Sequence, residues 1–252
     1  MAVSIKSARE IELMREAGKR LAHVHQELEA MIAPGISTWE IDAKGEKLIR
    51  DCGCIPNFLH YNGYPASICV SVNDEVVHGI PRKDRYLKEG DIVSLDAGLI
   101  YKGYHSDAAR THAVGKVSTE AQKLMDVTKQ SFFEGIKMAK EGQHLHDISR
   151  AIEEYVTPYG YGIVRDLVGH GIGTALHEDP QIPNFPQKRR GVKLLPGMTL
   201  AIEPMINMGR ADVCWLDDEW TVVTMDGSLS AHYENTILIT DGEPEILTLT
   251  EY

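Results

Sequence analysis

The sequence predicts a single α+β domain over residues 1–252, in which helices cover an antiparallel sheet. Two observations support this prediction. The order helix, helix, strands occurs twice, in pseudo-repeats at about residues 7–114 and 120–240, and matching residues of the two copies keep a constant spacing. Because no linker-like stretch separates the copies, we expect one domain with an internal pseudo-two-fold axis and a cleft shared by the two copies.

The first copy opens with two helices, each of which has a Ser-x-x-Glu capping box at its start. The first helix follows Ser7, and its apolar residues recur every three or four positions as far as residue 31. Pro34-Gly35 ends this helix. The second helix follows Ser37 and runs to about Gly53.

Three strands follow, at residues 68–72, 91–101 and 104–114, since these segments are rich in β-branched and aromatic residues and are bounded by Gly or Pro. Lys102-Gly103 is the predicted turn of a hairpin between the second and third strands. This turn pairs Tyr101 with the residue after Gly103, and it therefore sets residue 96 opposite residue 109.

The second copy repeats this plan. Its helices are predicted at 120–140 and 144–155, and its strands at 200–203 and 232–238. Gly35 and Gly142, which each precede a helix, are separated by 142 − 35 = 107 positions. The same offset aligns the segment that contains Asp96 with the segment that contains Glu203, so one carboxylate lies at the same strand position in each copy.

Composition and charge limit the possible functions. The net charge of −11, from 26 basic and 37 acidic side chains, argues against binding to nucleic acid or to an anionic membrane. The one dense basic run, Lys188-Arg189-Arg190, is expected to be a solvated loop. The N-terminus is polar and no apolar stretch approaches the ~20 residues of a membrane span, so we expect a cytoplasmic location. The four cysteines lack the spacing of a disulfide framework or zinc site, so we expect reduced thiols; these are Cys52, Cys54, Cys69 and Cys214.

Acidic residues are the first candidates for chemistry. The predicted hairpin makes Asp96 and Asp107 diagonal neighbours on one face, with Cα atoms roughly 7–8 Å apart. Two carboxylates so close would repel unless a cation or proton lies between them, although a pair of surface aspartates would show the same spacing. The strands of the second copy deliver Glu203 and Glu234, which favours a shared site of four acids.

Histidines accompany these acids in both copies. His170 lies in the glycine-rich segment 169–173, where the backbone can approach a site closely, and His177 follows it. The first copy contains an echo of this segment around His78. We expect His78 and His177 to act in acid–base chemistry or in oxyanion stabilisation rather than as ligands.

Four carboxylates and one imidazole carry a charge of about −4, which two divalent ions would balance while leaving room for a bridging hydroxide. Oxygen-rich ligation with a single nitrogen and no thiolate favours manganese, iron or cobalt over a structural zinc site, and zinc also remains a candidate.

These residues occur in a fixed order within short motifs that span most of the chain. The motifs are Val77-His78-Gly79-Ile80-Pro81, Asp96 with Asp107, Gly169-His170-Gly171 with His177, Glu203-Pro204 and Glu234. In this order they resemble the signature of the type I methionine aminopeptidases. The resemblance implies the pita-bread fold, which is an internally duplicated α+β domain, and removal of the initiator methionine from new proteins, preferably when the second residue is small.

The resemblance also implies a role for each site residue. Asp96 would bind one metal ion, His170 and Glu203 the other, and Asp107 and Glu234 both. A water that bridges the ions would attack the first peptide bond, with Glu203 as the proton acceptor. His177 would stabilise the tetrahedral oxygen, and His78 would contact the scissile amide.

A methionine side chain would bind in an apolar pocket. The resemblance assigns this pocket to Phe58, Tyr61, Tyr64, Cys69, Leu176 and Trp220. Phe58 and Leu176 depart from the best-known bacterial pattern, where a cysteine and an aromatic residue are common. The resemblance further implies a monovalent cation, sodium or potassium, near Asn73, Glu75 and Ser230.

Two alternatives remain open from the sequence. A prolidase or proline-specific aminopeptidase resembles this chain in its metal ligands, but such enzymes usually carry an additional N-terminal domain, and only ~30 residues precede Pro34-Gly35 here, fewer than the ~50 of a small domain. A non-catalytic binding module of the same fold would generally lack the metal ligands.

We expect a monomer that acts on nascent polypeptide N-termini and makes a transient ribosome contact.

Overall fold

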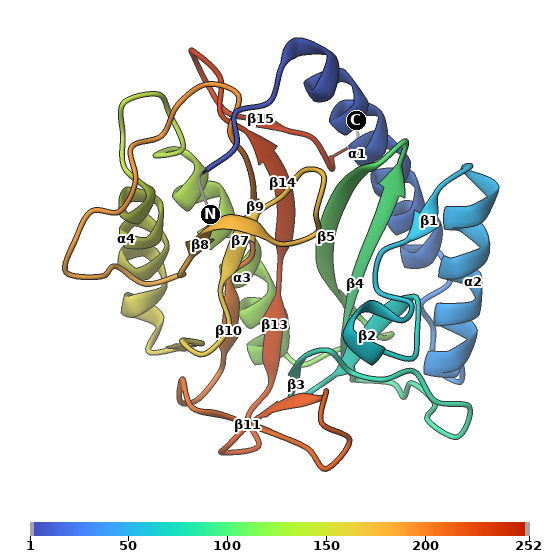
Figure 1. Ribbon diagram of the computed structural model, residues 1–252. Helices are drawn as coiled ribbons and strands as arrows, with labels where there is room; N and C mark the ends of the chain where they lie inside the picture. The colour runs from blue at the N-terminus through green and yellow to red at the C-terminus, as the bar shows by residue number, and fades with distance from the viewer. Residues whose placement is uncertain (1–2, 250–252) are drawn as a thin grey trace.

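The structure is a computed structural model that describes residues 3–249. One nine-stranded antiparallel sheet forms its centre (Figure 1). Its strands are β1 (Ile55–Pro56), β2 (Ile68–Val72), β4 (Ile92–Tyr101), β5 (Tyr104–Ala113), β7 (Gly169–Gly171), β8 (Glu178–Ile182), β9 (Thr199–Ile202), β14 (Glu234–Leu238) and β15 (Glu245–Ile246). They follow the order β1-β4-β5-β14-β9-β7-β8, with β2 beside β4 and β15 beside β14.

Four α-helices and two short 3-10 helices accompany the sheet. They are α1 (Ala8–Glu29), α2 (Thr38–Asp51), η1 (Tyr61–Gly63), α3 (Thr119–Ile136), α4 (Leu145–Val156) and η2 (Thr157–Tyr159). All four predicted α-helices are present, and the predicted capping boxes at Ser7 and Ser37 are formed. In Figure 1 the blue helices α1 and α2 lie toward the right, and α4 lies at the left. Among residues 3–249, no helix is long and apolar enough to cross a membrane.

The two halves of the chain repeat each other in detail, as predicted. In the sheet, β4 and β5 mirror β9 and β14 about the centre of the strand order. An isolated bridge pairs Ser37 with Tyr86 in the first half, and another pairs His144 with Lys193 in the second. Both members of the second bridge lie 107 positions beyond those of the first, since 144 − 37 and 193 − 86 both equal 107. The predicted internal duplication of the α+β fold is therefore confirmed.

Two small sheets were not predicted. One has the order β13-β10-β6, and the other β11-β12-β3. Their strands are β3 (Glu75–Val77), β6 (Gly162–Ile163), β10 (Met205–Asn207), β11 (Val213–Trp215), β12 (Val222–Thr224) and β13 (Ser230–His232). The predicted strand at 232–238 is interrupted at Tyr233, because its two ends pair with different sheets.

Each half has its own apolar core. In the first half, residues of α1 and α2 such as Leu21 and Ile49 pack against β2, β4 and β5. In the second half, residues of α3 and α4 such as Phe132 and Ile148 pack against strands that include β9 and β14. Burial of one helical stripe against a sheet face explains why the amphipathic patterns located the helices correctly.

Candidate active site

The β4–β5 hairpin has the predicted register. Tyr101 pairs with Tyr104, and Asp96 pairs with Ala109. The turn residues Lys102 and Gly103 both have positive φ, at 49° and 85°, as a two-residue hairpin turn requires. Asp107 lies two residues before Ala109 and shares its face of the sheet, so it is a diagonal neighbour of Asp96.

Glu234 of the second half lies in line with Asp96 across the sheet. Glu234 of β14 pairs with Ala109 of β5, so Ala109 has Asp96 on one side and Glu234 on the other. Directly paired residues of antiparallel strands share a face, and both carboxylates therefore project to one side of the sheet. The register of β14 against β5 connects the acids of the two halves.

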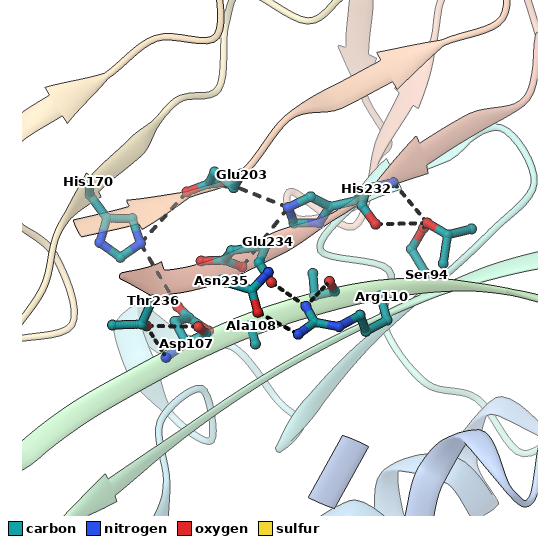
Figure 2. Close-up of polar contacts among 12 residues, drawn as sticks. Ser94, Asp107, Ala108, Arg110, His170, Glu203, His232, Glu234, Asn235 and Thr236 are labelled. Carbon is teal, nitrogen blue, oxygen red and sulfur yellow. Dashed lines mark hydrogen bonds and ion pairs between the residues drawn. The ribbon is translucent and has the colours of Figure 1, made fainter. Parts of the chain in front are cut away.

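His170 and Glu203 complete the cluster (Figure 2). The Nε2 atom of His170 lies 3.7 Å from Glu203 Oε1 and 3.9 Å from Asp107 Oδ2. Asp107, His170 and Glu234 offer ligand atoms within 4.8 Å of one another. Glu203 directly follows β9, whose Ala201 pairs with His170.

Burial and mutual repulsion disfavour the charged forms of these acids. Burial raises the pKa of Asp96 to about 7, although a hydrogen bond with Asp107 opposes the shift. Burial raises the pKa of Asp107 and Glu203 well above the ordinary range, and Asp96 adds to both shifts. Burial and Asp107 do the same to the pKa of Glu234. Such a cluster needs bound protons or cations.

The donor set fits divalent cations. Within residues 3–249, buried oxygens of Asp96, Asp107 and Glu234 lack a hydrogen-bond partner, a cost that coordination would remove. Burial and the neighbouring His177 lower the pKa of His170 to about 3, so its imidazole is neutral and has a lone pair to donate. Four carboxylates and one imidazole are ligands that manganese, iron, cobalt and zinc all accept.

The two further predicted histidines lie close to this cluster. The ring of His177 is 4.4 Å from the ring of His170, and its Nδ1 is 2.8 Å from the Tyr61 hydroxyl. His78 has a φ of 60°, a strained value that often marks functional residues. Burial and the nearby His177 lower the pKa of His78 to about 4.

All six predicted pocket residues join one apolar cluster. Phe58, Tyr64, Cys69 and Leu176 are buried in it, and Tyr61 and Trp220 pack against it. The Trp220 ring lies edge-on to Tyr64 at 5.1 Å and to His78 at 6.4 Å. This cluster therefore adjoins the histidines. A separate cavity of about 510 Å³ lies between α1, α3 and β5, and none of the predicted site residues lines it.

The sequence analysis missed a histidine beside the cluster. His232 is 1% exposed, and its Nε2 lies 3.8 Å from Glu203 Oε2 and 4.0 Å from Glu234 Oε2. The hydroxyl of Thr111 accepts from the His232 backbone N–H and donates to its carbonyl, each at 2.9 Å. Its position two residues before Glu234, in a segment predicted as strand, was the signal that could have revealed it.

A second threonine fixes Asp107. The Thr236 hydroxyl accepts from the Asp107 N–H at 3.1 Å and donates to the Asp107 carbonyl at 2.9 Å (Figure 2). Arg110 donates to the carbonyl of Glu234 and to the side-chain oxygen of Asn235. The backbones that carry two of the acids are thus held by side chains of the neighbouring strand.

Of the three residues predicted to lie near a monovalent cation, two are brought together by a hydrogen bond. The Ser230 N–H donates to the Asn73 carbonyl at 2.9 Å, which brings those two backbones together. Glu75 instead pairs with Arg85 and accepts from the Val72 N–H. Its carboxylate is therefore occupied by the protein's own donors.

The fold and the buried carboxylate–histidine cluster define a metallopeptidase. A family model described as metallopeptidase family M24 matches residues 12–241, which include every predicted site residue. The chain belongs to this family.

Several full-length relatives of the chain are methionine aminopeptidases. The chain is 54% identical over 249 residues to the methionine aminopeptidase of Clostridium acetobutylicum, which covers 99% of this chain and 100% of that protein. It is 51% identical to methionine aminopeptidase 1 of Bacillus subtilis over 96% of this chain and 98% of that one. The crystal structure of the Thermotoga maritima methionine aminopeptidase superposes with a TM-score of 0.97 at 46% identity, over 99% of this chain and 100% of that one.

A prolidase is similar to this chain in fold. The Pyrococcus furiosus prolidase has a TM-score of 0.78 at 24% identity, and the match covers 98% of this chain but 66% of the prolidase. The full-length relatives therefore distinguish the two enzyme classes.

Proposed function

We propose that this chain is a methionine aminopeptidase that removes the initiator methionine from nascent proteins, preferably when the second residue is small. The observation that carries the proposal is the place of His177. It contacts His170 of the acidic cluster and Tyr61 of the apolar cluster, so one residue joins the candidate metal ligands to the candidate methionine pocket.

In this proposal Asp96, Asp107, His170, Glu203 and Glu234 hold two divalent ions. Bound there, the ions would supply Lewis acidity and would lower the pKa of the attacking water to about 7. Glu203 takes the proton of the attacking water. His78 contacts the scissile amide and assists its departure.

His177 stabilises the tetrahedral oxygen of the substrate. Desolvation by the surrounding residues lowers the pKa of His177, so the ring is neutral near pH 7. This role requires the ring proton on Nε2, which then donates to the oxyanion, while Nδ1 accepts from the Tyr61 hydroxyl 2.8 Å away. Met side chains pack well against aromatic rings, which suits the cluster around Tyr64 and Trp220 to the substrate.

We further propose that residues 1–252 act as one catalytic domain, in the cytoplasm and as a monomer, with transient contact to the ribosome. A monovalent cation near Asn73 and Ser230 is also proposed, with Glu75 left out of its ligands because of the Arg85 ion pair.

The test is an assay of metal-free protein titrated with manganese, iron, cobalt or zinc, with Met-Ala-Ser and Ala-Pro peptides as substrates. We expect cleavage of Met-Ala-Ser and two ions per chain by elemental analysis. Turnover of Ala-Pro alone would support a proline-specific enzyme. Protein that binds no metal after supplementation would support a binding module.

A further inference from the structure

The turn 173–178 carries two predicted site residues, Leu176 and His177, and ends at Glu178. The Oε1 atom of Glu178 accepts from the backbone N–H groups of Thr174 at 2.8 Å and of Ala175 at 3.3 Å. This carboxylate therefore closes the turn from within through hydrogen bonds to its backbone.

The other oxygen of Glu178 binds the N-terminal segment. Lys6 Nζ lies 2.6 Å from Oε2, and the Ser4 hydroxyl donates to the same oxygen at 2.7 Å. The Lys6 and Glu178 side chains are 6% and 15% exposed. Burial alone would raise the pKa of Glu178, but the bonds from Lys6 and Ser4 lower it to about 2. The Glu178 carboxylate stays ionised over the range in which the enzyme would work.

Lys6 is itself fixed on both sides. Its backbone N–H donates to the Gly197 carbonyl at 2.8 Å. Its side chain lies directly on Gly173, where an added Cβ would come within 2.5 Å of Lys6 Cε and 2.6 Å of Glu178 Oε1. The His105 N–H also donates to the Gly173 carbonyl at 2.8 Å. The start of the turn is thereby held against both the N-terminal segment and β5.

His177 itself is exposed, and its ring contacts the side chains of Tyr61 and His170. The direction of its ring therefore depends on the backbone of the turn. A buried ion pair adds little net stability over an apolar pair of the same shape, which favours a positioning role here.

We propose that the Lys6–Glu178 ion pair positions His177 for catalysis by fixing the turn 173–178. This rests on the proposed function, since the role of His177 belongs to it. Lys6 and Glu178 are positioning residues, because they act through His177 and do not touch the substrate.

The experiment compares Lys6→Met, Lys6→Arg and the double variant Lys6→Met/Glu178→Gln in manganese-loaded enzyme on Met-Ala-Ser, with Tm measured for each. Lys6→Met should lower kcat by about 10-fold, the scale of a small misplacement of a catalytic group. Lys6→Arg should recover most of the activity. The double variant removes both buried charges, so its Tm should recover while kcat stays low.

A cycle with His177→Ala decides the mechanism. In that background Lys6→Met should lower kcat no further, because its effect passes through the missing imidazole. Glu245→Gln is the matched control, since it breaks the Arg15 ion pair to the N-terminal helix at 2.7 Å without touching the turn, and its kcat should match wild type.

Additive losses in the cycle, or recovery of kcat together with Tm in the double variant, would show that the pair is merely structural. Wild-type enzyme that fails to cleave Met-Ala-Ser would overturn the proposed function and the inference with it. Active wild type with unaffected Lys6 variants would overturn the inference alone.

Discussion

The two halves of the molecule share one frame but bring their acids to the site by different routes. In the first half, β4 and β5 have ten residues each and are joined by a two-residue turn. In the second half, β9 and β14 have four and five residues, and the strands β10 to β13 intervene. A local hairpin therefore fixes Asp96 against Asp107, whereas long-range pairing must place Glu203 beside Glu234.

Each half also holds the backbone of a residue in the other half through a threonine side chain. Thr236 of the second half brackets the backbone of Asp107, and Thr111 of the first half brackets the backbone of His232. Asp107 of β5 and His232 of β13 thus occupy equivalent places in the two halves. The duplication explains why a buried imidazole lies at this position, which no sequence motif marks.

The largest expected effect concerns one ligand from each half. Asp107→Asn and Glu234→Gln should each lower kcat/KM by more than about 100-fold and reduce bound metal, because losing a ligand should cost more than losing a ligand's hydrogen-bond partner. Elemental analysis and peptide assays measure both effects. Asp84→Asn, at a surface ion pair, is the control. A large loss in only one variant would mean that the halves contribute unequally.

The two catalytic histidines, also one from each half, come next. His177→Ala and His78→Ala should each lower kcat by about 100-fold while metal content stays unchanged. Loss of metal from the His177 variant would show that His177 is a ligand and that its role has been exchanged with that of His170.

Low pH should destabilise β5 more than β14, because β5 carries His112, whereas β14 carries no histidine. Burial, Arg110 and Lys129 lower the pKa of His112 to about 4, and Glu29 lies 3.9 Å from its Nδ1. Since the unfolded chain binds this proton near pH 6.5, folded stability falls as the pH drops from 6.5 to 4. His112→Gln should remove up to about 3 kcal/mol of that loss, measured by denaturant unfolding at pH 7 and 4.5. An unchanged pH dependence would refute this.

The two threonines that hold the backbones of Asp107 and His232 can be compared directly by substitution. Thr236→Val should cost about 1–2 kcal/mol of stability and lower kcat by about 10-fold, since it frees the backbone of a proposed ligand. Thr111→Val should cost similar stability with a smaller loss of activity. Equal losses of kcat would show that catalysis depends on the position of His232 as much as on that of Asp107.

The smallest effect belongs to the turn that only the first half has. Lys102 holds a φ of 49°, which asparagine adopts more readily than lysine. Lys102→Asn should raise stability by about 0.5 kcal/mol without changing kcat, as unfolding and peptide assays would show. A loss of activity would mean that the turn does more than join two strands.

Local patterns made much of the molecule predictable. Capping boxes and apolar periodicity located the four α-helices, and Lys102-Gly103 set the register that places Asp96 opposite Ala109. The 107-residue offset revealed the duplication. These features depend on neighbours within a few positions or on comparison of the chain with itself, so the sequence contains them directly.

Tertiary structure decided what depends on distant segments. The sequence alone determined the helices, the hairpin and the duplicated frame, and the motif order pointed to the family. Only packing decided that β14 lies between β5 and β9, that His232 faces Glu203 and Glu234, and that Lys6 meets Glu178. The raised pKa values of the acids also arise only on burial, because desolvation and mutual repulsion exist only once the chain has folded.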